Sequence, residues 1–297
     1  MGVSIIMTAL DEPYVNKTID DIIEKSGPLL EEIIVIDDLS KTPIHHPEAK
    51  VIRNEQRKGL IWGRDYATEL AKSEIILSLD PHCKVEDGWL APLVNKLESN
   101  KESIVVPGTR SLNPDKWESF GKESWKTTWD WKLEFRWIGG ENPYTPAVAG
   151  HCFAFRKDWW EKAGRFDTGM EIWGGENIEF PLRTWLFGGT VECVRESHIS
   201  HWFKKKFQYP FPPNVLLRNK SRIAEVWFDE YKDVFYNKIK KPRGTINFGD
   251  LRERIAIKKR MQKRSFEWFI KNVSIKLWNS MFDGTVKALP SLVEDFV

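Results

Sequence analysis

The first hundred residues alternate between two hydrophobic patterns, and this alternation constrains the fold more than any other feature of the sequence. Short β-rich runs are separated by stretches with the three-to-four-residue spacing of helices. We expect strands at 3–7, 32–36, 50–53 and 75–79, and helices at 14–25, 60–72 and 89–97. Strands that alternate with helices usually pair in parallel, with helices on both faces. The sequence therefore predicts an α/β fold with a mostly parallel sheet flanked by helices.

The rest of the chain changes character twice. Residues 105–145 are rich in aromatic side chains and irregular in pattern, which indicates long loops that carry substrate contacts. Residues 221–236 and 250–271 return to helical spacing, with a turn-rich segment between them. We therefore expect a main α/β domain over 1–237, followed by a basic helical extension over 238–297 that packs on it.

Charge and cysteine content exclude several classes of protein. The net charge of +2 is too small to indicate a partner, but residues 238–264 carry eleven Lys or Arg against two acidic residues. Such a segment is either a solvated helix face or an anion-binding surface. Three cysteines imply no disulfide framework, and no stretch reaches the ~18 apolar residues of a transmembrane helix. We expect a cytoplasmic protein that does not contact a membrane.

Two of the expected strands end in acidic side chains. Asp37 and Asp38 follow one strand, and Asp80, Pro81 and His82 follow another. In such sheets, ligands bind beyond the carboxyl ends of the strands. A carboxylate and an imidazole one residue apart can converge on one cation, and oxygen and nitrogen ligands with open positions suit Mn²⁺, with Mg²⁺ as the second choice. The alternative is an Asp that caps a turn beside a surface His, because so short a motif recurs by chance.

A glycine-rich motif, Trp-Gly-Gly-Glu-Asn at 173–177, lies further along the chain. Paired glycines let the backbone approach a ligand closely, and Glu176 and Asn177 place polar groups beside it. His201 is a candidate third ligand for the cation, the alternative being a histidine satisfied in the core. The 15 Trp offer flat faces for sugars, bases or nucleotides, although core packing is the ordinary use of each one.

Over nearly its whole length the sequence resembles the catalytic domain of the polypeptide N-acetylgalactosaminyltransferases. The matching residues are Thr8, Asp11, Glu12 and the segments 32–38, 55–60, 80–83, 88–90, 131–137, 172–177, 224–227, 229–232 and 265–268. So many ordered matches make the resemblance specific. It implies a GT-A (Rossmann-like) fold and a glycosyltransferase that uses a UDP-sugar and retains the anomeric configuration.

The resemblance also implies roles for individual residues. Asp80, His82 and His201 would bind Mn²⁺. The catalytic residues Trp173, Glu176 and Asn177 would line the sugar and the reaction centre. The residues that would bind the nucleotide-sugar are Thr8, Asp38 and Arg57 at the uridine, Gly150 and His151 beneath the sugar, and Lys204 and Tyr209 at the diphosphate. The departing diphosphate can itself accept the acceptor's proton, so no dedicated general base is expected.

The sequence departs from the family at positions that bear on the donor. Where the family has two adjacent glycines beneath the sugar, this chain reads Gly150 and His151. An imidazole there would crowd or hydrogen-bond the sugar, which favours a hexose without the N-acetyl group. Lys204 stands where the family has an arginine, and it offers a point charge rather than a bidentate fork. The absence of cysteines expected of secretory members, and of an anchor and lectin domain, favours the cytoplasm of a microbial or virus-infected cell.

The sequence leaves three classes of acceptor molecule open. The resemblance implies a Ser or Thr hydroxyl of a protein. The basic side chains favour a hydroxymethyl group on a modified DNA pyrimidine such as 5-hydroxymethylcytosine, as in phage DNA, and we place it first. These basic residues are 204–206, Arg218, Lys220, Arg222 and the expected helix at 238–264. Exposed Trp within 117–137 would stack on a displaced base. A saccharide is third, and a non-catalytic binding module is disfavoured because the metal ligands, Arg57 and Glu176 are all present.

Overall fold

Strands and helices form along most of residues 2–204 and 211–281, which the computed structural model describes. The strands are β1 Val3–Ala9, β2 Leu30–Asp37, β3 Lys50–Arg53, β4 Ile75–Leu79, β5 Cys83–Val85, β6 Ser103–Asn113, β7 Glu118–Ser124, β8 Lys126–Trp129, β9 Phe135–Ile138, β10 Cys152–Arg156 and β11 Thr190–His201. The helices are α1 Val15–Ser26, α2 Leu60–Leu70, α3 Leu90–Ser99, α4 Lys157–Lys162, α5 Glu176–Leu186, α6 Asn214–Trp227, α7 Lys232–Ile239, α8 Arg252–Met261, α9 Phe266–Asn272 and α10 Ile275–Ser280. Short 3-10 turns lie at Gly27–Leu29, Asp229–Tyr231 and Arg243–Thr245.

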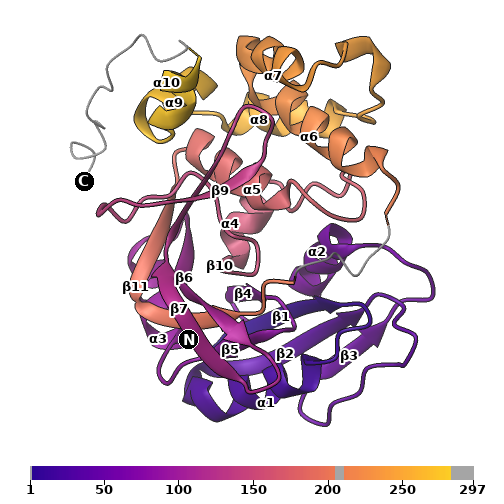
Figure 1. Cartoon of the computed structure of the whole chain (residues 1–297), viewed down its shortest axis with the longest axis vertical. Helices are drawn as coiled ribbons and strands as arrows, with labels where there is room; N and C mark the ends of the chain where they lie inside the picture. The colour runs from indigo at the N-terminus through magenta and orange to yellow at the C-terminus, as the bar shows by residue number, and fades with distance from the viewer. Residues whose placement is uncertain (1, 205–210, 282–297) are drawn as a thin grey trace.

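One large sheet organises the molecule. Its strand order is β3-β2-β1-β4-β10-β6-β11-β5, and β7 pairs with β6. The pairs β1–β2, β1–β4, β2–β3 and β6–β11 are parallel, whereas β10 runs antiparallel between β4 and β6. The expected α/β fold, a sheet flanked by helices, is confirmed (Figure 1).

Two apolar layers cover the two faces of the sheet. Successive residues of a strand point to opposite faces. Ile5 therefore joins a cluster with Ile19 of α1 and Leu93 of α3, whereas its neighbour Ile6 joins the cluster that contains Phe180 of α5. The fully buried pattern of β1 and β4 explains why these runs read as continuous apolar stretches in the sequence.

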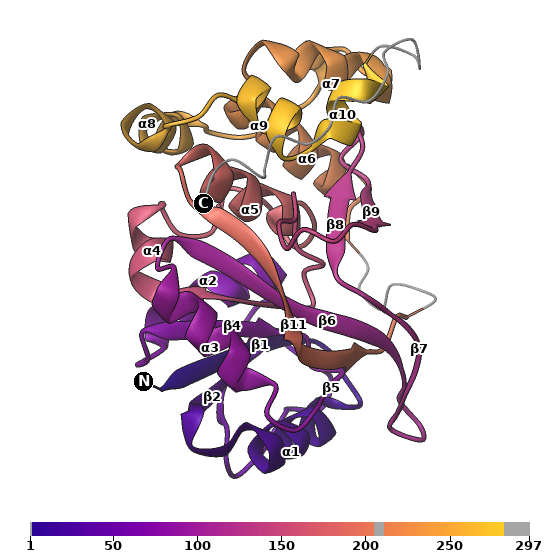
Figure 2. The ribbon, with the colours of Figure 1, turned by 90° about the vertical axis from the view of Figure 1, so that its left-hand side faces the viewer.

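Helices α6 to α10 gather at one end of the molecule, beyond α5 (Figures 1 and 2). The core on the α5 face continues into them through the buried side chains of Trp227, Phe235 and Phe269. The expectation of one helix over the basic segment 238–264 was wrong. In the structure α7 ends at Ile239 and α8 begins only at Arg252. Pro242 and the following turn interrupt the helical path.

The aromatic stretch 105–145 is more regular than its composition indicates. It contains β8, β9, β7 and most of β6, so the expectation of an irregular segment was wrong. Trp129 and Trp131 are buried, and the Trp131 indole N–H donates to the Leu277 carbonyl at 3.0 Å. Neither ring is available to stack on a base, because both pack against the C-terminal helices.

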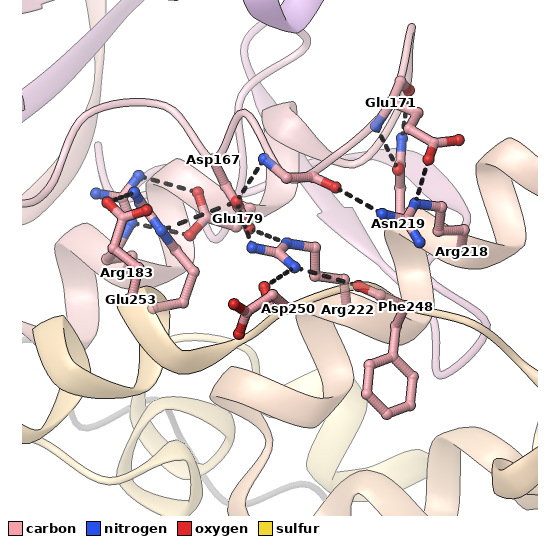
Figure 3. Close-up of polar contacts among 12 residues, drawn as sticks. Asp167, Glu171, Glu179, Arg183, Arg218, Asn219, Arg222, Phe248, Asp250 and Glu253 are labelled. Carbon is pink, nitrogen blue, oxygen red and sulfur yellow. Dashed lines mark hydrogen bonds and ion pairs between the residues drawn. The ribbon is translucent and has the colours of Figure 1, made fainter.

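A buried ion pair joins the loop between α4 and α5 to the C-terminal helices (Figure 3). Arg222 of α6 donates through Nε and Nη2 to the two carboxylate oxygens of Asp167, at 2.7 and 2.9 Å. Its Nη1 donates to the carbonyls of Phe248 and Asp250, at 3.1 and 2.5 Å. Arg222 is therefore a structural residue, and the expectation that it meets a phosphate backbone was wrong.

Replacing Trp131 with Ala is expected to lower the free energy of unfolding by about 3–5 kcal/mol, because the substitution leaves a cavity in the core. Phe120 is 56% exposed on β7 and provides the matched control. Phe120→Ala should leave the midpoint of chemical denaturation nearly unchanged. Equal, small shifts for both variants would contradict the placement of Trp131 in the core.

Candidate active site

A pocket of about 610 Å³ opens at the carboxyl ends of β1, β2 and β4. Such an edge is where ligands bind in sheets of this kind. The pocket is lined by the following residues expected at a site: Thr8, Asp38, Arg57, Asp80, His82, Gly150, His151, Trp173, Glu176, Asn177, His201 and Lys204. Tyr209 lies outside the described residues. Side chains from distant parts of the chain thus share one cavity, although their individual roles remain predictions.

Asp80, His82 and His201 form a group whose potential ligand atoms all lie within 4.8 Å of one another. Asp80 follows β4, His82 lies two residues on, and His201 ends β11. The two histidines face each other through their Nε2 atoms, 3.0 Å apart, and Asp80 Oδ2 is 3.5 Å from His201 Nε2. Two nitrogen lone pairs and one carboxylate oxygen that converge in this way fit a divalent cation.

Burial and neighbouring charges hold His201 and Asp80 in the protonation states that bind a metal ion. Burial lowers the pKa of His201 to about 4, so its imidazole is neutral at pH 7. Burial of Asp80 acts to raise the pKa of that carboxyl, but His201, His82 and Arg64 together hold it well below its usual range. A neutral imidazole and an ionised carboxylate are the forms that bind a metal ion.

Glu12 contacts the metal-binding group through His82. Its buried carboxylate places Oε2 3.2 Å from His82 Nδ1, and the same residue forms an ion pair with Lys204. A carboxylate on the second ring nitrogen fixes the tautomer of a metal-binding histidine and leaves Nε2 to face the metal. Burial raises the pKa of Glu12, but His82 and Lys204 outweigh it and hold the pKa below its ordinary value.

Glu176 begins α5 and has partners on both carboxylate oxygens. Oε1 accepts from Arg64 Nη1 at 3.0 Å, and Oε2 accepts from the Gly174 backbone N–H at 3.1 Å. Asn177 donates to the Val148 carbonyl at 3.3 Å. Gly150 lies beneath these residues with a φ of +86°, and a Cβ atom there would come within 3.3 Å of the Asn177 Cβ. The left-handed backbone conformation favours glycine, and a side chain there would also press on Asn177.

The loop before α5 is held by a residue that sequence reasoning missed. Asn219 of α6 is fully buried, and its amide nitrogen donates to the carbonyls of Glu171, Trp173 and Gly174, at 2.9, 3.1 and 2.9 Å. Its amide oxygen accepts from the Glu171 N–H at 2.9 Å (Figure 3). A side chain that bonds one loop through both its amide nitrogen and its amide oxygen determines the position of Trp173.

The segment that carries the expected nucleotide-binding residue Arg57 lies beside this loop, because the Leu60 N–H donates to the Ile172 carbonyl at 2.7 Å. Asp38 accepts hydrogen bonds from the backbone N–H groups of Lys58 and Gly59, at 2.7 and 2.9 Å, and its Oδ2 is 4.0 Å from Arg57 Nε. Asp38 thereby shapes the loop that carries Arg57. The Thr8 hydroxyl is buried and has no hydrogen-bond partner within the described residues, as expected of a group that meets a ligand.

His151 forms part of the pocket wall. Its Nε2 lies 2.9 Å from the Thr109 hydroxyl, and its ring stacks on His201 with centroids 4.4 Å apart. Burial is the main cause that lowers the pKa of His151 well below its usual value, so the ring is neutral. The imidazole therefore presents a neutral, mostly fixed surface to the cavity, where two glycines would leave open space.

Sequence reasoning also missed Glu12 and Arg64 as site residues. Glu12 stood in a matching segment, but no spacing rule assigns a carboxylate to a histidine 70 positions away. Arg64 lies within α2, where an arginine is ordinarily a surface residue. Only the buried Asn219 carried a local signal, since a polar residue at an inward-facing helical position needs a partner.

No helix within the described part of the chain is long and apolar enough to cross a membrane.

Comparison with known proteins supports the interpretation of the pocket. The family model "Glycosyl transferase family 2" matches residues 4–164. A putative polypeptide N-acetylgalactosaminyltransferase 9 of Drosophila melanogaster is 31% identical over 92% of this chain and 46% of the relative. Polypeptide N-acetylgalactosaminyltransferase 3 of Homo sapiens is 34% identical over 88% of this chain and 47% of the relative. The chain thus spans about half the length of these curated relatives.

Solved structures agree with this result. A crystal structure of GalNAc-T7 with UDP, GalNAc and Mn²⁺ matches with a TM-score of 0.86 and 27% identity, over 94% of this chain and 58% of that one. A structure of TarS from S. aureus in complex with UDP-GlcNAc matches with a TM-score of 0.57 and 13% identity, over 81% of this chain and 72% of that one. The second match shows a shared fold alone.

Replacing His201 with Ala should weaken Mn²⁺ binding by more than the ~10–100-fold that loss of an outer-shell partner costs, because it removes a ligand. Isothermal titration of Mn²⁺ into the purified protein measures this. His198 lies on the same strand, pairs with Glu123 and is not in the pocket, so His198→Ala is the matched control and should bind as the wild type does. Unaltered binding by the His201 variant would contradict the metal site.

Proposed function

The chain belongs to glycosyl transferase family 2, and we propose that it is a metal-dependent glycosyltransferase that moves a hexose from a UDP-sugar to a hydroxyl acceptor. One observation carries the proposal: the group Asp80, His82 and His201 lies in the same pocket as Arg57 and Glu176. The structural likeness to GalNAc-T7, solved with UDP and Mn²⁺, supports this donor and this ion.

The proposed metal is Mn²⁺, with Mg²⁺ as the second choice. Asp80, His82 and His201 would hold it, and it would supply positive charge to neutralise the diphosphate leaving group. Arg57 and Lys204 line the same pocket and add positive charge to it. Thr8 and Asp38 lie where the uridine would bind, and Asp38 acts largely by fixing the loop that carries Arg57.

If configuration is retained, the contacts of Glu176 favour attack on the face that the diphosphate leaves over a double displacement through an enzyme-bound sugar. Both of its carboxylate oxygens are hydrogen-bonded, to Arg64 and to the Gly174 N–H, so the group is poorly placed to act as a nucleophile or a general base. The acceptor's proton can pass to the departing diphosphate. Glu176, Asn177 and Trp173 then serve to hold the sugar and orient the acceptor.

The acceptor we propose is a Ser or Thr hydroxyl of a polypeptide. The relatives named polypeptide N-acetylgalactosaminyltransferases support this choice over a DNA pyrimidine. The structural basis for DNA is weak, because Trp129, Trp131 and Arg222 are buried. Lys258 also has partners within the protein, because its ammonium group donates to the Val226 carbonyl and to Asp229. A saccharide acceptor remains the third possibility.

We further propose that residues 1–237 form the catalytic domain and that 238–297 are a helical extension packed on it, with residues 282–297 lying outside the described part of the chain. The buried side chains of Ile257, Phe266 and Phe269 support the packing, since they share the core of the α5 face. A cytoplasmic site of action in a microbial or virus-infected cell stays a prediction.

His151→Gly tests the donor. We expect the wild type to prefer UDP-glucose or UDP-galactose to UDP-N-acetylgalactosamine, because the imidazole fills space beneath the sugar. The glycine variant should shift the ratio of kcat/KM values toward UDP-N-acetylgalactosamine by roughly 10-fold, the scale of a small pocket change. The measurement is UDP release with each donor. The same donor ranking in both proteins would show that His151 does not select the sugar.

A panel of acceptors tests the choice of substrate. A Ser/Thr peptide library, a duplex with 5-hydroxymethylcytosine and an oligosaccharide are each incubated with UDP-sugar and Mn²⁺, and products are weighed by mass spectrometry. We expect a hexose mass increase on peptide, lost in excess chelator and in Asp80→Ala. A mass increase on the duplex without labelled peptide would restore DNA as the acceptor.

A further inference from the structure

Arg64 occupies an unusual position for an arginine in a helix. It lies in the first turns of α2, its side chain is 2% exposed, and it forms part of the pocket wall. The helix is anchored beside the loop before α5, because Leu60 N–H donates to the Ile172 carbonyl at 2.7 Å. Gly59 permits this contact, since a Cβ atom there would lie 2.3 Å from the Ile172 Cα.

The guanidinium group contacts three separate parts of the site. Nη1 donates to Glu176 Oε1 at 3.0 Å, and Nη2 donates to Asp80 Oδ1 at 3.2 Å. Nη2 also donates to the Gly150 carbonyl. The other face of the group lies over the Phe153 ring, 5.3 Å from its centroid. One buried cation therefore holds a metal ligand, a residue of the reaction centre and the backbone beneath the sugar.

The two oxygens of Asp80 are used differently. Oδ1 accepts from Arg64, whereas Oδ2 faces the histidines, 3.5 Å from His201 Nε2 and 3.9 Å from His82 Nε2. A hydrogen bond to one carboxylate oxygen orients the other toward a metal. The planar fork of arginine can hold two carboxylates in fixed relation, which a single ammonium cannot do with the same geometry.

We propose that Arg64 is a positioning residue that fixes Asp80 and Glu176 relative to each other and so joins the metal site to the reaction centre. This inference rests on the proposed function, because it takes Asp80 as a metal ligand and Glu176 as part of the reaction centre. Arg64 acts through these two residues and through the Gly150 carbonyl.

Two effects oppose each other when Arg64 is replaced by Met. Loss of a positive charge beside Asp80 would by itself strengthen cation binding. Loss of the hydrogen bond to Oδ1 lets the carboxylate rotate and weakens binding by about 10–100-fold, the usual effect of removing an outer-shell partner. If Arg64 positions Asp80, loss of the hydrogen bond has the larger effect, and the affinity for Mn²⁺ falls. The sign of the change therefore separates positioning from simple charge balance.

Arg183 provides a matched control. It is a fully buried arginine on α5 that donates to both carboxylate oxygens of Glu179, at 2.9 and 3.0 Å, and lies outside the pocket. It also donates to the carbonyls of Ala163 and Arg165, and its guanidinium lies over the Phe180 ring, 5.0 Å from the centroid. Arg183→Met and Arg183→Lys remove a comparable buried fork, so they report the general cost of such a change to the fold.

The experiment measures Mn²⁺ affinity by isothermal titration and by electron paramagnetic resonance of the free ion, without donor or acceptor. We expect Arg64→Met to bind about 10-fold more weakly or worse, Arg64→Lys to bind with intermediate affinity, and both Arg183 variants to match the wild type. Thermal melts identify the variants that fold. If Arg64→Met does not fold, Arg64→Lys carries the test, because it keeps the buried charge.

Kinetics at saturating Mn²⁺ provide the second measurement. In the Arg64 variants kcat should stay reduced when metal is restored, because Glu176 has lost its partner, while KM for the donor changes little. Unchanged or tighter Mn²⁺ binding by folded Arg64 variants would overturn the role of Arg64 alone. A wild-type protein that binds no Mn²⁺ would overturn the proposed function as well, so the two failures are distinguishable.

Discussion

Parallel pairing of β1 with β2 and β4 is the constraint on which the rest of the structure depends. In this arrangement the strands ending at Ala9, Asp37 and Leu79 open onto one edge of the sheet. The polar residues that follow each strand then meet in one pocket. An antiparallel neighbour would send its end to the opposite edge, and Asp38 and Asp80 would be separated by the length of a strand.

The edge of the sheet supplies only part of the site. His201 arrives on β11, which pairs with β5 so that His201 lies opposite Cys83, next to His82. Glu176 and Trp173 arrive from the start of α5, and the buried Asn219 of α6 holds the loop before them. The C-terminal helices therefore contribute to the geometry of the pocket, and the Arg222–Asp167 ion pair attaches them to the same loop (Figure 3).

Buried charge in the pocket is balanced locally. The carboxylates of Glu12, Asp80 and Glu176 lie beside the cations of Lys204 and Arg64 and the polar imidazole of His82. Because isolated buried charges are costly, these side chains constrain one another's positions. A divalent cation in this network would meet an ionised Asp80 and a neutral His201 that their neighbours already hold in place, which reduces the ordering that binding must impose.

The sequence alone was sufficient for the local elements: the strands expected at 50–53 and 75–79 have those bounds, because their hydrophobic pattern depends only on near neighbours. The metal group could be named because Asp80 and His82 are one residue apart in the sequence and because the resemblance to the family implies His201 as the third ligand. Tertiary structure alone decided that Trp129, Trp131 and Arg222 are buried, and that Glu12, Arg64 and Asn219 support the site. Burial and partner choice depend on which distant elements pack together, and apart from the inward-facing helical position of Asn219 no local pattern contains that information.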